Sequence, residues 1–68
     1  MENIQISLKA ARYNAGLKIV DAAAKIGISP STLIKWEANP EIVTPEKQRI
    51  ISEVYNFPID NIIFLTRK

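Results

Sequence analysis

The chain has 68 residues, with nine Lys or Arg against seven Asp or Glu, so its formal net charge is +2. This length predicts one small domain, residues 1–68, because such a chain can close only a single modest core. The absence of Cys and His excludes thiol catalysis, Ser-His triads and the usual zinc sites. We therefore expect a protein that is not an enzyme and needs no metal and no cofactor.

Apolar residues make up 47% of the chain and charged residues 24%, which is typical of a folded globular domain. The longest apolar runs, at 22–24 and 62–65, are much shorter than the roughly 20 residues that a membrane span requires. The N-terminus lacks the apolar core of a signal peptide. We expect a cytoplasmic protein with no membrane contact.

The first two predicted helices are bounded by recognisable end signals. Ser7 is suited to cap a helix N-terminus, and Gly16 is suited to end that helix. Leu8, Ala11 and Ala15 recur between them at helical spacing. An alanine-rich segment follows Leu17 and predicts a second helix that ends at Gly27.

Three further helices are predicted in the second half of the chain. Ser29-Pro30 and Thr44-Pro45 each join a capping hydroxyl to a proline at the first helical position, where its missing N–H costs no hydrogen bond. These helices run to about Ala38 and Asn56. A short fifth helix is predicted at about 59–65, followed by the polar tail 66–68. The expected fold class is all-α, a compact domain of five helices.

Residues 19–38 are the most informative stretch, since only Gly27-Ile28-Ser29 separates the two helices within it. Helices joined so tightly meet at a steep angle, and the second can enter the major groove of DNA. Its apolar residues are needed inside, which leaves four positions facing outward: Pro30, Ser31, Ile34 and Lys35.

Taken in order, these residues resemble the Cro/CI-type (XRE-like) helix-turn-helix domains of phage repressors and related bacterial regulators. The resemblance covers roughly residues 6–65 and implies a lambda-repressor-like fold and a regulator that binds double-stranded operator DNA. The matching residues are Leu8-Lys9, Arg12, Gly16-Leu17, Ala23, Lys25-Ile26-Gly27-Ile28-Ser29, Thr32-Leu33, Trp36-Glu37, Thr44-Pro45 and Ile59-Asp60-Asn61-Ile62-Ile63.

The resemblance implies roles for individual residues. Ser31 and Lys35 fall where family members read base edges, and Pro30 and Ile34 lie on the same face, where they could contact thymine methyl groups. Lys35 is the best base reader because lysine can donate to guanine, although neutralising a phosphate is an equally weighted alternative. The phosphate-contact candidates are Lys9, Arg12, Lys18, Ile19, Thr32 and Asn39.

Arg12, Glu37 and Trp36 have structural interpretations. Arg12 and Glu37 occupy positions where the family pairs an arginine of the first helix with a glutamate after the recognition helix. We favour this bracing pair over a solvated one. Trp36 follows Leu33 at helical spacing, which favours core packing over stacking on a base.

The sequence departs from the family pattern at two places. Family members commonly begin the second helix with a Thr-Gln pair that grips a phosphate, whereas this chain has Lys18-Ile19. The Pro30-Ser31 pair lacks the Gln or Arg side chains that usually read bases. Specificity is therefore expected to be modest, or to depend on DNA shape and on residues outside the motif.

A homodimer, at least on DNA, is expected because one such module reads only a few base pairs. The C-terminal segment has more apolar residues than a short helix needs, and its dimer-contact candidates are Phe57, Ile59, Ile63, Phe64 and Leu65. The alternative is that this whole cluster belongs to the core.

The charges separate along the chain. Residues 8–35 hold five basic residues against Asp21, a local charge of +4, whereas residues 36–66 hold two basic residues against five acidic ones, a local charge of −3. The positive part coincides with the helix-turn-helix, which favours DNA as the partner. A module of the same fold that binds a repressor protein is the alternative.

Overall fold

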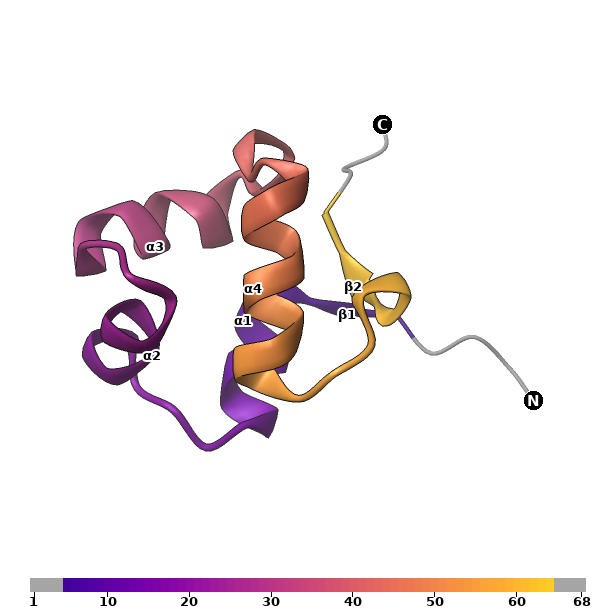
Figure 1. Cartoon of the computed structure of the whole chain (residues 1–68), viewed down its shortest axis with the longest axis horizontal. Coiled ribbons are helices and arrows are strands. Elements are labelled where there is room, and N and C mark those ends of the chain that lie inside the picture. The colour runs from indigo at the N-terminus through magenta and orange to yellow at the C-terminus, as the bar shows by residue number, and fades with distance from the viewer. Residues whose placement is uncertain (1–4, 65–68) are drawn as a thin grey trace.

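The computed structural model describes residues 5–64, which form four α-helices, two 3₁₀ turns and two short strands. The strands and the 3₁₀ turns span only two or three residues each. The elements in chain order are β1 (Ile6–Ser7), α1 (Leu8–Asn14), α2 (Ile19–Ile26), α3 (Pro30–Ala38), η1 (Pro40–Ile42), α4 (Pro45–Tyr55), η2 (Ile59–Asn61) and β2 (Ile62–Ile63). The strands lie on the side of α1 and α4 away from α2 and α3 (Figure 1).

Three of the helices begin at the hydroxyl caps that the sequence predicts. The side chains of Ser7, Ser29 and Thr44 each accept a hydrogen bond from the backbone N–H three residues later, at 3.0, 3.2 and 3.3 Å. These bonds satisfy donors that a helix start would otherwise leave free. Lys18 precedes α2 without a side-chain capping bond.

The turns depend on residues that accept a left-handed backbone. Gly16 has φ +74° and Gly27 has φ +92°, and α4 ends at Asn56 with φ +53°. Gly27 connects α2 to α3, and a Cβ there would have no atom of a non-adjacent residue within 4 Å. The requirement for glycine at this turn is therefore conformational rather than steric.

The core lies among the four helices and the strand pair. Ala22 and Ala23 are completely buried, and their small side chains allow α2 to pack closely on both α3 and α4. The remaining buried apolar residues are Leu8, Ala11, Ile26, Leu33, Val43, Ile51, Tyr55, Ile62 and Phe64. Every helix thus contributes to one small core.

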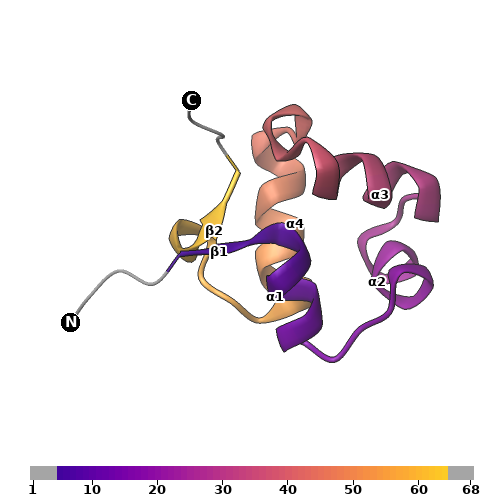
Figure 2. The same cartoon turned by 180° about the vertical axis from the view of Figure 1, so that it is seen from behind.

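The fifth helix predicted at about 59–65 does not form in the described residues. Ile59–Asn61 makes only a 3₁₀ turn, and β2 then pairs in parallel with β1, with Ile6 opposite Ile62 (Figure 2). The side chains of residues 62–64 alternate between buried, exposed and buried, which is the period of a strand. The fold is therefore mostly helical, with a strand pair that the sequence analysis did not predict.

Candidate nucleic-acid interface

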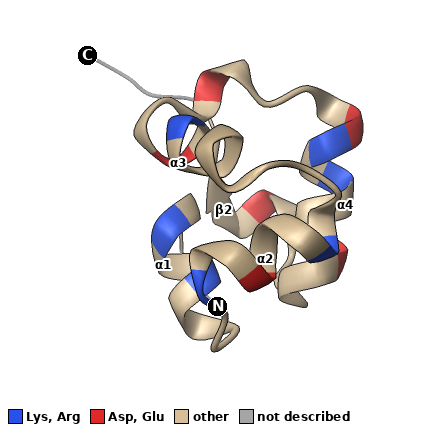
Figure 3. Ribbon diagram, turned by 90° about the vertical axis from the view of Figure 1, so that its left-hand side faces the viewer, with Lys and Arg blue, Asp and Glu red and all other residues tan. Residues whose placement is uncertain are grey.

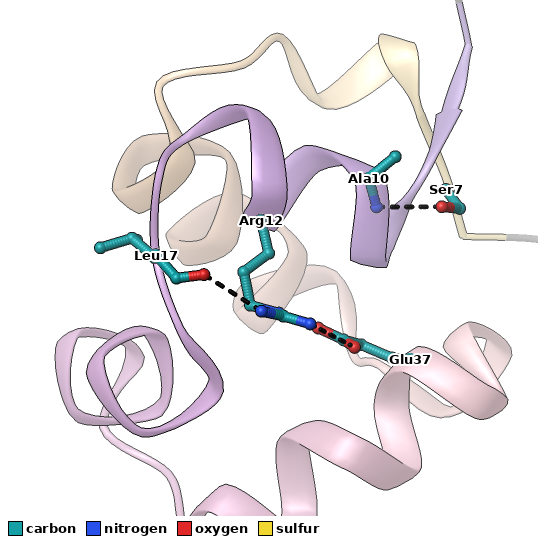
Figure 4. Close-up of polar contacts among 5 residues, drawn as sticks. All are labelled: Ser7, Ala10, Arg12, Leu17 and Glu37. Atoms are coloured by element: carbon teal, nitrogen blue, oxygen red, sulfur yellow. Dashed lines mark hydrogen bonds and ion pairs between the residues drawn. The ribbon is translucent and has the colours of Figure 1, made fainter.

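The guanidinium of Arg12 connects α1 to the end of α3. Its Nε donates to Oε2 of Glu37 at 2.6 Å, and its Nη2 donates to Oε1 at 3.2 Å. Its Nη1 donates to the carbonyl oxygen of Leu17 at 3.1 Å (Figure 4). One side chain of α1 thus holds both α3 and the loop that leads into α2.

Burial makes this pair structural rather than a surface contact. The side chain of Arg12 is 6% exposed and that of Glu37 is 9% exposed. The hydrogen bond to Glu37 raises the pKa of Arg12 above its ordinary value, against the opposing effect of burial. Because so little of the guanidinium is accessible, the geometry favours bracing over the phosphate contact that was also expected of Arg12.

Tyr13 is a neighbour of this pair that the sequence analysis did not single out. The guanidinium carbon of Arg12 lies 4.9 Å from the centre of the Tyr13 ring, and Nζ of Lys9 lies 5.9 Å from it. Both distances suit a cation–π contact. The spacing of Lys9 and Tyr13, four residues apart in one helix, is the signal that could have identified one of these contacts.

The Tyr55 hydroxyl is buried, and it has no hydrogen-bond partner among the described residues. Burial raises the pKa of this phenol to about 12, and the negative charge of Glu37 acts in the same direction. Tyr55 belongs to α4, and the positive charge of Arg12 acts on its pKa in the opposite direction to Glu37.

The outward face of α3 carries the four predicted base-reading residues. Pro30, Ser31, Ile34 and Lys35 are all exposed, with Ile34 at 56%. On the opposite face, Leu33 is fully buried and Trp36 packs partly buried against the core. The helix therefore presents these four side chains to solvent together.

Hydroxyl groups are linked to one another where α3 begins. Oγ of Ser29 lies 2.8 Å from Oγ1 of Thr32 and 3.2 Å from Oγ of Ser31. The same oxygen accepts the backbone N–H of Thr32. The Ser31 and Thr32 hydroxyls therefore already have a partner within the chain.

The other phosphate-contact candidates surround α2 and α3. Lys9, Lys18 and Asn39 are exposed, and Ile19 is partly buried at the first position of α2. The helix start at Ile19 lacks a side-chain cap, and backbone N–H groups at such an end suit a phosphate oxygen. Asp21 in the same turn opposes an anion there.

The helix-turn-helix part of the molecule has an excess of positive charge. Within residues 8–38 the Arg12–Glu37 pair cancels, which leaves Lys9, Lys18, Lys25 and Lys35 against Asp21. Figure 3 views the molecule from the side of α2 and α3, and basic positions are visible on both helices and on α1. This arrangement suits a polyanion.

A helix-turn-helix family model matches residues 8–62. The chain belongs to the Cro/CI-type (XRE-like) helix-turn-helix family. It is thus related to DNA-binding transcriptional regulators, and this family is not an enzymatic one. Comparisons with curated proteins and with solved structures give no match.

Residues 5–64 contain no group of three or more acidic side chains placed to hold a metal ion. None of the helices in this described part is long and apolar enough to cross a membrane.

The predicted dimer-contact residues of the helix-turn-helix domain separate into different environments. Phe64 is 7% exposed and belongs to the core, whereas Ile63 is 36% exposed. Phe57 and Ile59 are partly buried against the core, and Leu65 lies outside the described residues. Phe64 therefore follows the alternative interpretation, in which the C-terminal apolar residues belong to the core. Ile63 is the most exposed of the described candidates for a dimer contact.

Proposed function

We propose that the protein is a sequence-specific transcriptional regulator of the phage Cro or repressor type, which occupies operator DNA through the major groove. The observation that carries the proposal is the exposed outward face of α3, with Pro30, Ser31, Ile34 and Lys35 together. Family membership supplies the DNA-binding role. A cytoplasmic location follows from this proposal, since the DNA is the site of action.

The recognition helix is α3, and α2 lies across the backbone behind it. Lys35 donates to a guanine edge, and Lys9 and Lys18 neutralise phosphates. The first turn of α2 offers backbone N–H groups to a phosphate in place of the glutamine that the family pattern would supply. Arg12 and Glu37 act indirectly, because their pairing fixes α3 relative to α1.

A homodimer on two half-sites is part of the proposal. One recognition helix reads only a few base pairs, and two modules about one helical turn apart give an operator its affinity. The exposed side chain of Ile63, in strand β2 of the strand pair, supports a contact between copies at this edge.

The test is a selection from random duplex DNA, followed by binding measurements over a series of salt concentrations. Operator binding predicts an enriched sequence that is bound far more tightly than random DNA, and an affinity that falls steeply as salt rises. A failure to enrich any sequence would contradict the proposal.

Three lysine and arginine variants sharpen this test. Lys35→Ala is expected to relax preference at one base pair by about 1–3 kcal/mol. Lys18→Ala is expected to weaken all sequences alike and to reduce the salt slope by about one. Arg49→Ala is the matched control, because Arg49 is an exposed cation of α4 in the acidic part of the chain, and it should change neither quantity.

Binding to a repressor protein is the second candidate function. The outward face of α3 has one long polar side chain, Lys35, which is a weak complement for reading bases and favours this candidate. If Lys18→Ala and Lys35→Ala both leave DNA binding unchanged while a repressor chain still associates, this candidate replaces the first.

A further inference from the structure

Tyr13 in α1 is the most exposed large hydrophobic side chain that the structure describes, with 66% of the residue accessible. It belongs neither to the buried core nor to the residues packed against the core. Within residues 5–64, its hydroxyl group has no hydrogen-bond partner. Because a phenol hydroxyl is a hydrogen-bond donor, Tyr13 offers an unused donor to a partner.

The ring of Tyr13 lies beside the group that links α1 to the helix-turn-helix. The guanidinium carbon of Arg12 is 4.9 Å from the centre of this ring. The same guanidinium donates to Glu37 near the end of α3 and to the carbonyl oxygen of Leu17 (Figure 4). Leu17 directly precedes Lys18, a predicted phosphate contact at the start of α2. Tyr13 is therefore close to segments that the proposed function places against the DNA backbone.

Arg12 has little capacity left for a phosphate group. Its side chain is only 6% exposed, and all three of its nitrogen atoms already donate within the chain. The ring of Tyr13 also lies against this guanidinium. A phosphate group that approaches this part of α1 therefore meets the exposed Tyr13 before the buried Arg12.

The ring of Tyr13 also contacts Lys9, an exposed lysine four residues earlier in α1. Nζ of Lys9 lies 5.9 Å from the ring centre, which suits a cation–π contact. A lysine side chain loses rotamer freedom when it binds a partner, and a lysine that already lies on a ring has less freedom to lose. The ring thus keeps a cation and a neutral donor together on α1.

Tyrosine and lysine side chains both donate to phosphate oxygen atoms in protein–DNA interfaces. We infer that Tyr13 is a phosphate-contact residue, whose hydroxyl group donates to a DNA phosphate oxygen and whose ring positions Lys9 at the same phosphate group. Tyr13 then supplies the contact that the buried Arg12 does not. This inference rests on the proposed function, in which Lys9 neutralises a phosphate group.

The first test measures binding to a random-sequence duplex over a series of salt concentrations, because phosphate contacts do not depend on base sequence. Tyr13→Phe removes the hydroxyl group and keeps the ring, so it should weaken binding roughly tenfold, the value of one hydrogen bond to a charged group. The salt slope should stay unchanged, since a neutral phenol releases no counterion. Tyr55→Phe is the matched control, because it removes a buried hydroxyl group, and it should bind as the wild type does.

A double-mutant cycle tests the positioning of Lys9 by the ring. In the wild-type background, Lys9→Ala should reduce the salt slope by about one. In a Tyr13→Leu background, Lys9→Ala should weaken binding roughly threefold less than in the wild type, because the ring that holds Lys9 is absent. A Tyr13→Phe background should restore the full effect of Lys9→Ala. Equal effects of Lys9→Ala with and without the ring would overturn the positioning role.

A scan of the DNA backbone tests whether the partner of Tyr13 is a phosphate group. Each phosphate of a selected operator is replaced singly by an uncharged methylphosphonate, in which a methyl group takes the place of one acceptor oxygen. At one position the replacement should weaken binding of the wild type, and Tyr13→Phe should then add little further loss. Independent losses at every position would overturn the contact.

The outcomes separate this inference from the function on which it rests. If the wild type binds duplex DNA with a steep salt dependence and Tyr13→Phe binds equally well, DNA binding stands and the contact of Tyr13 is overturned. A loss for Tyr13→Phe on a selected operator but not on random DNA also overturns it, because the hydroxyl group then reads a base. If the wild type binds no duplex DNA, the proposed function and this inference fail together. Urea denaturation should show that Tyr13→Phe is as stable as the wild type, so that any lost affinity reports the missing contact.

Discussion

The Arg12–Glu37 ion pair connects α1 to the end of α3. The two side chains lie 25 positions apart, and the structure joins them with Nε and Oε2 at 2.6 Å. The family pattern predicted their partnership. It did not predict the third acceptor, the Leu17 carbonyl oxygen, because backbone carbonyl groups have no sequence signature.

The burial of this pair predicts non-additive effects on stability. Arg12→Leu and Glu37→Leu should each lower the free energy of unfolding by about 3 kcal/mol, because each leaves an uncompensated buried charge. The double variant Arg12→Leu/Glu37→Leu should lose much less than the sum, since no charge then remains. Urea denaturation measures all three values, and additive losses would contradict the buried pairing.

The phenol of Tyr55 predicts a pH dependence at the alkaline end. Its pKa is about 12 in the folded chain and about 10 in an unfolded one, so folding favours the neutral phenol. This contribution to stability is complete below about pH 10 and is lost as the pH rises towards 12. Tyr13→Phe leaves Tyr55 as the only tyrosine, and the ultraviolet absorbance of its phenolate then reports the titration.

The control for this prediction is Tyr55→Phe, which removes the titrating group and keeps the ring in the core. Because the hydroxyl has no partner among the described residues, its loss should leave stability at neutral pH unchanged or slightly raised. It should also abolish the loss of stability between about pH 10 and 12. Titration of folded Tyr13→Phe near pH 10 would contradict the burial argument.

At the scale of elements, the sequence predicted helix starts well and the C-terminal segment poorly. The hydroxyl caps at Ser7, Ser29 and Thr44 act on their immediate neighbours, so local sequence contains the information. The run at 62–65 is apolar throughout, and a short apolar run cannot distinguish helix from strand by its period. Pairing with β1, more than 50 positions away, decides it.

The turn between α2 and α3 predicts how substitutions of Gly27 change the free energy of unfolding. Gly27 has φ +92°, so Gly27→Ala should lower the free energy of unfolding by about 1 kcal/mol through backbone strain. Gly27→Asn should lose less, because asparagine accepts left-handed backbone more readily. Gly27→Val should lose more than either. Since a Cβ meets nothing within 4 Å, equal losses for the three variants would contradict a conformational cause.

At the scale of the whole molecule, the basic residues are separated from the acidic ones, and the helix-turn-helix is separated from the strand pair. The lysines of α1 to α3 and the exposed face of α3 occur in the first part of the chain, and the acidic residues occur mainly after it. The strand pair lies on the far side of α1 and α4 from the helix-turn-helix (Figure 1). The sum of charges in each segment of the sequence predicted the separation of basic from acidic residues. The position of the strand pair could not be predicted in this way, because it depends on contacts between distant parts of the chain.

The exposed edge of the strand pair predicts which residue joins two copies of the protein on DNA. Ile62 is buried while Ile63 points away from the core and is 36% exposed, so Ile63→Asp should fold with little loss of stability. If this edge joins two copies on DNA, the variant should bind a two-half-site operator much more weakly and a single half-site as well as the wild type does. Sedimentation with and without operator gives the stoichiometry. Ile42→Asp is the matched control, and an Ile63→Asp protein that still binds the full operator as a dimer would place the contact elsewhere.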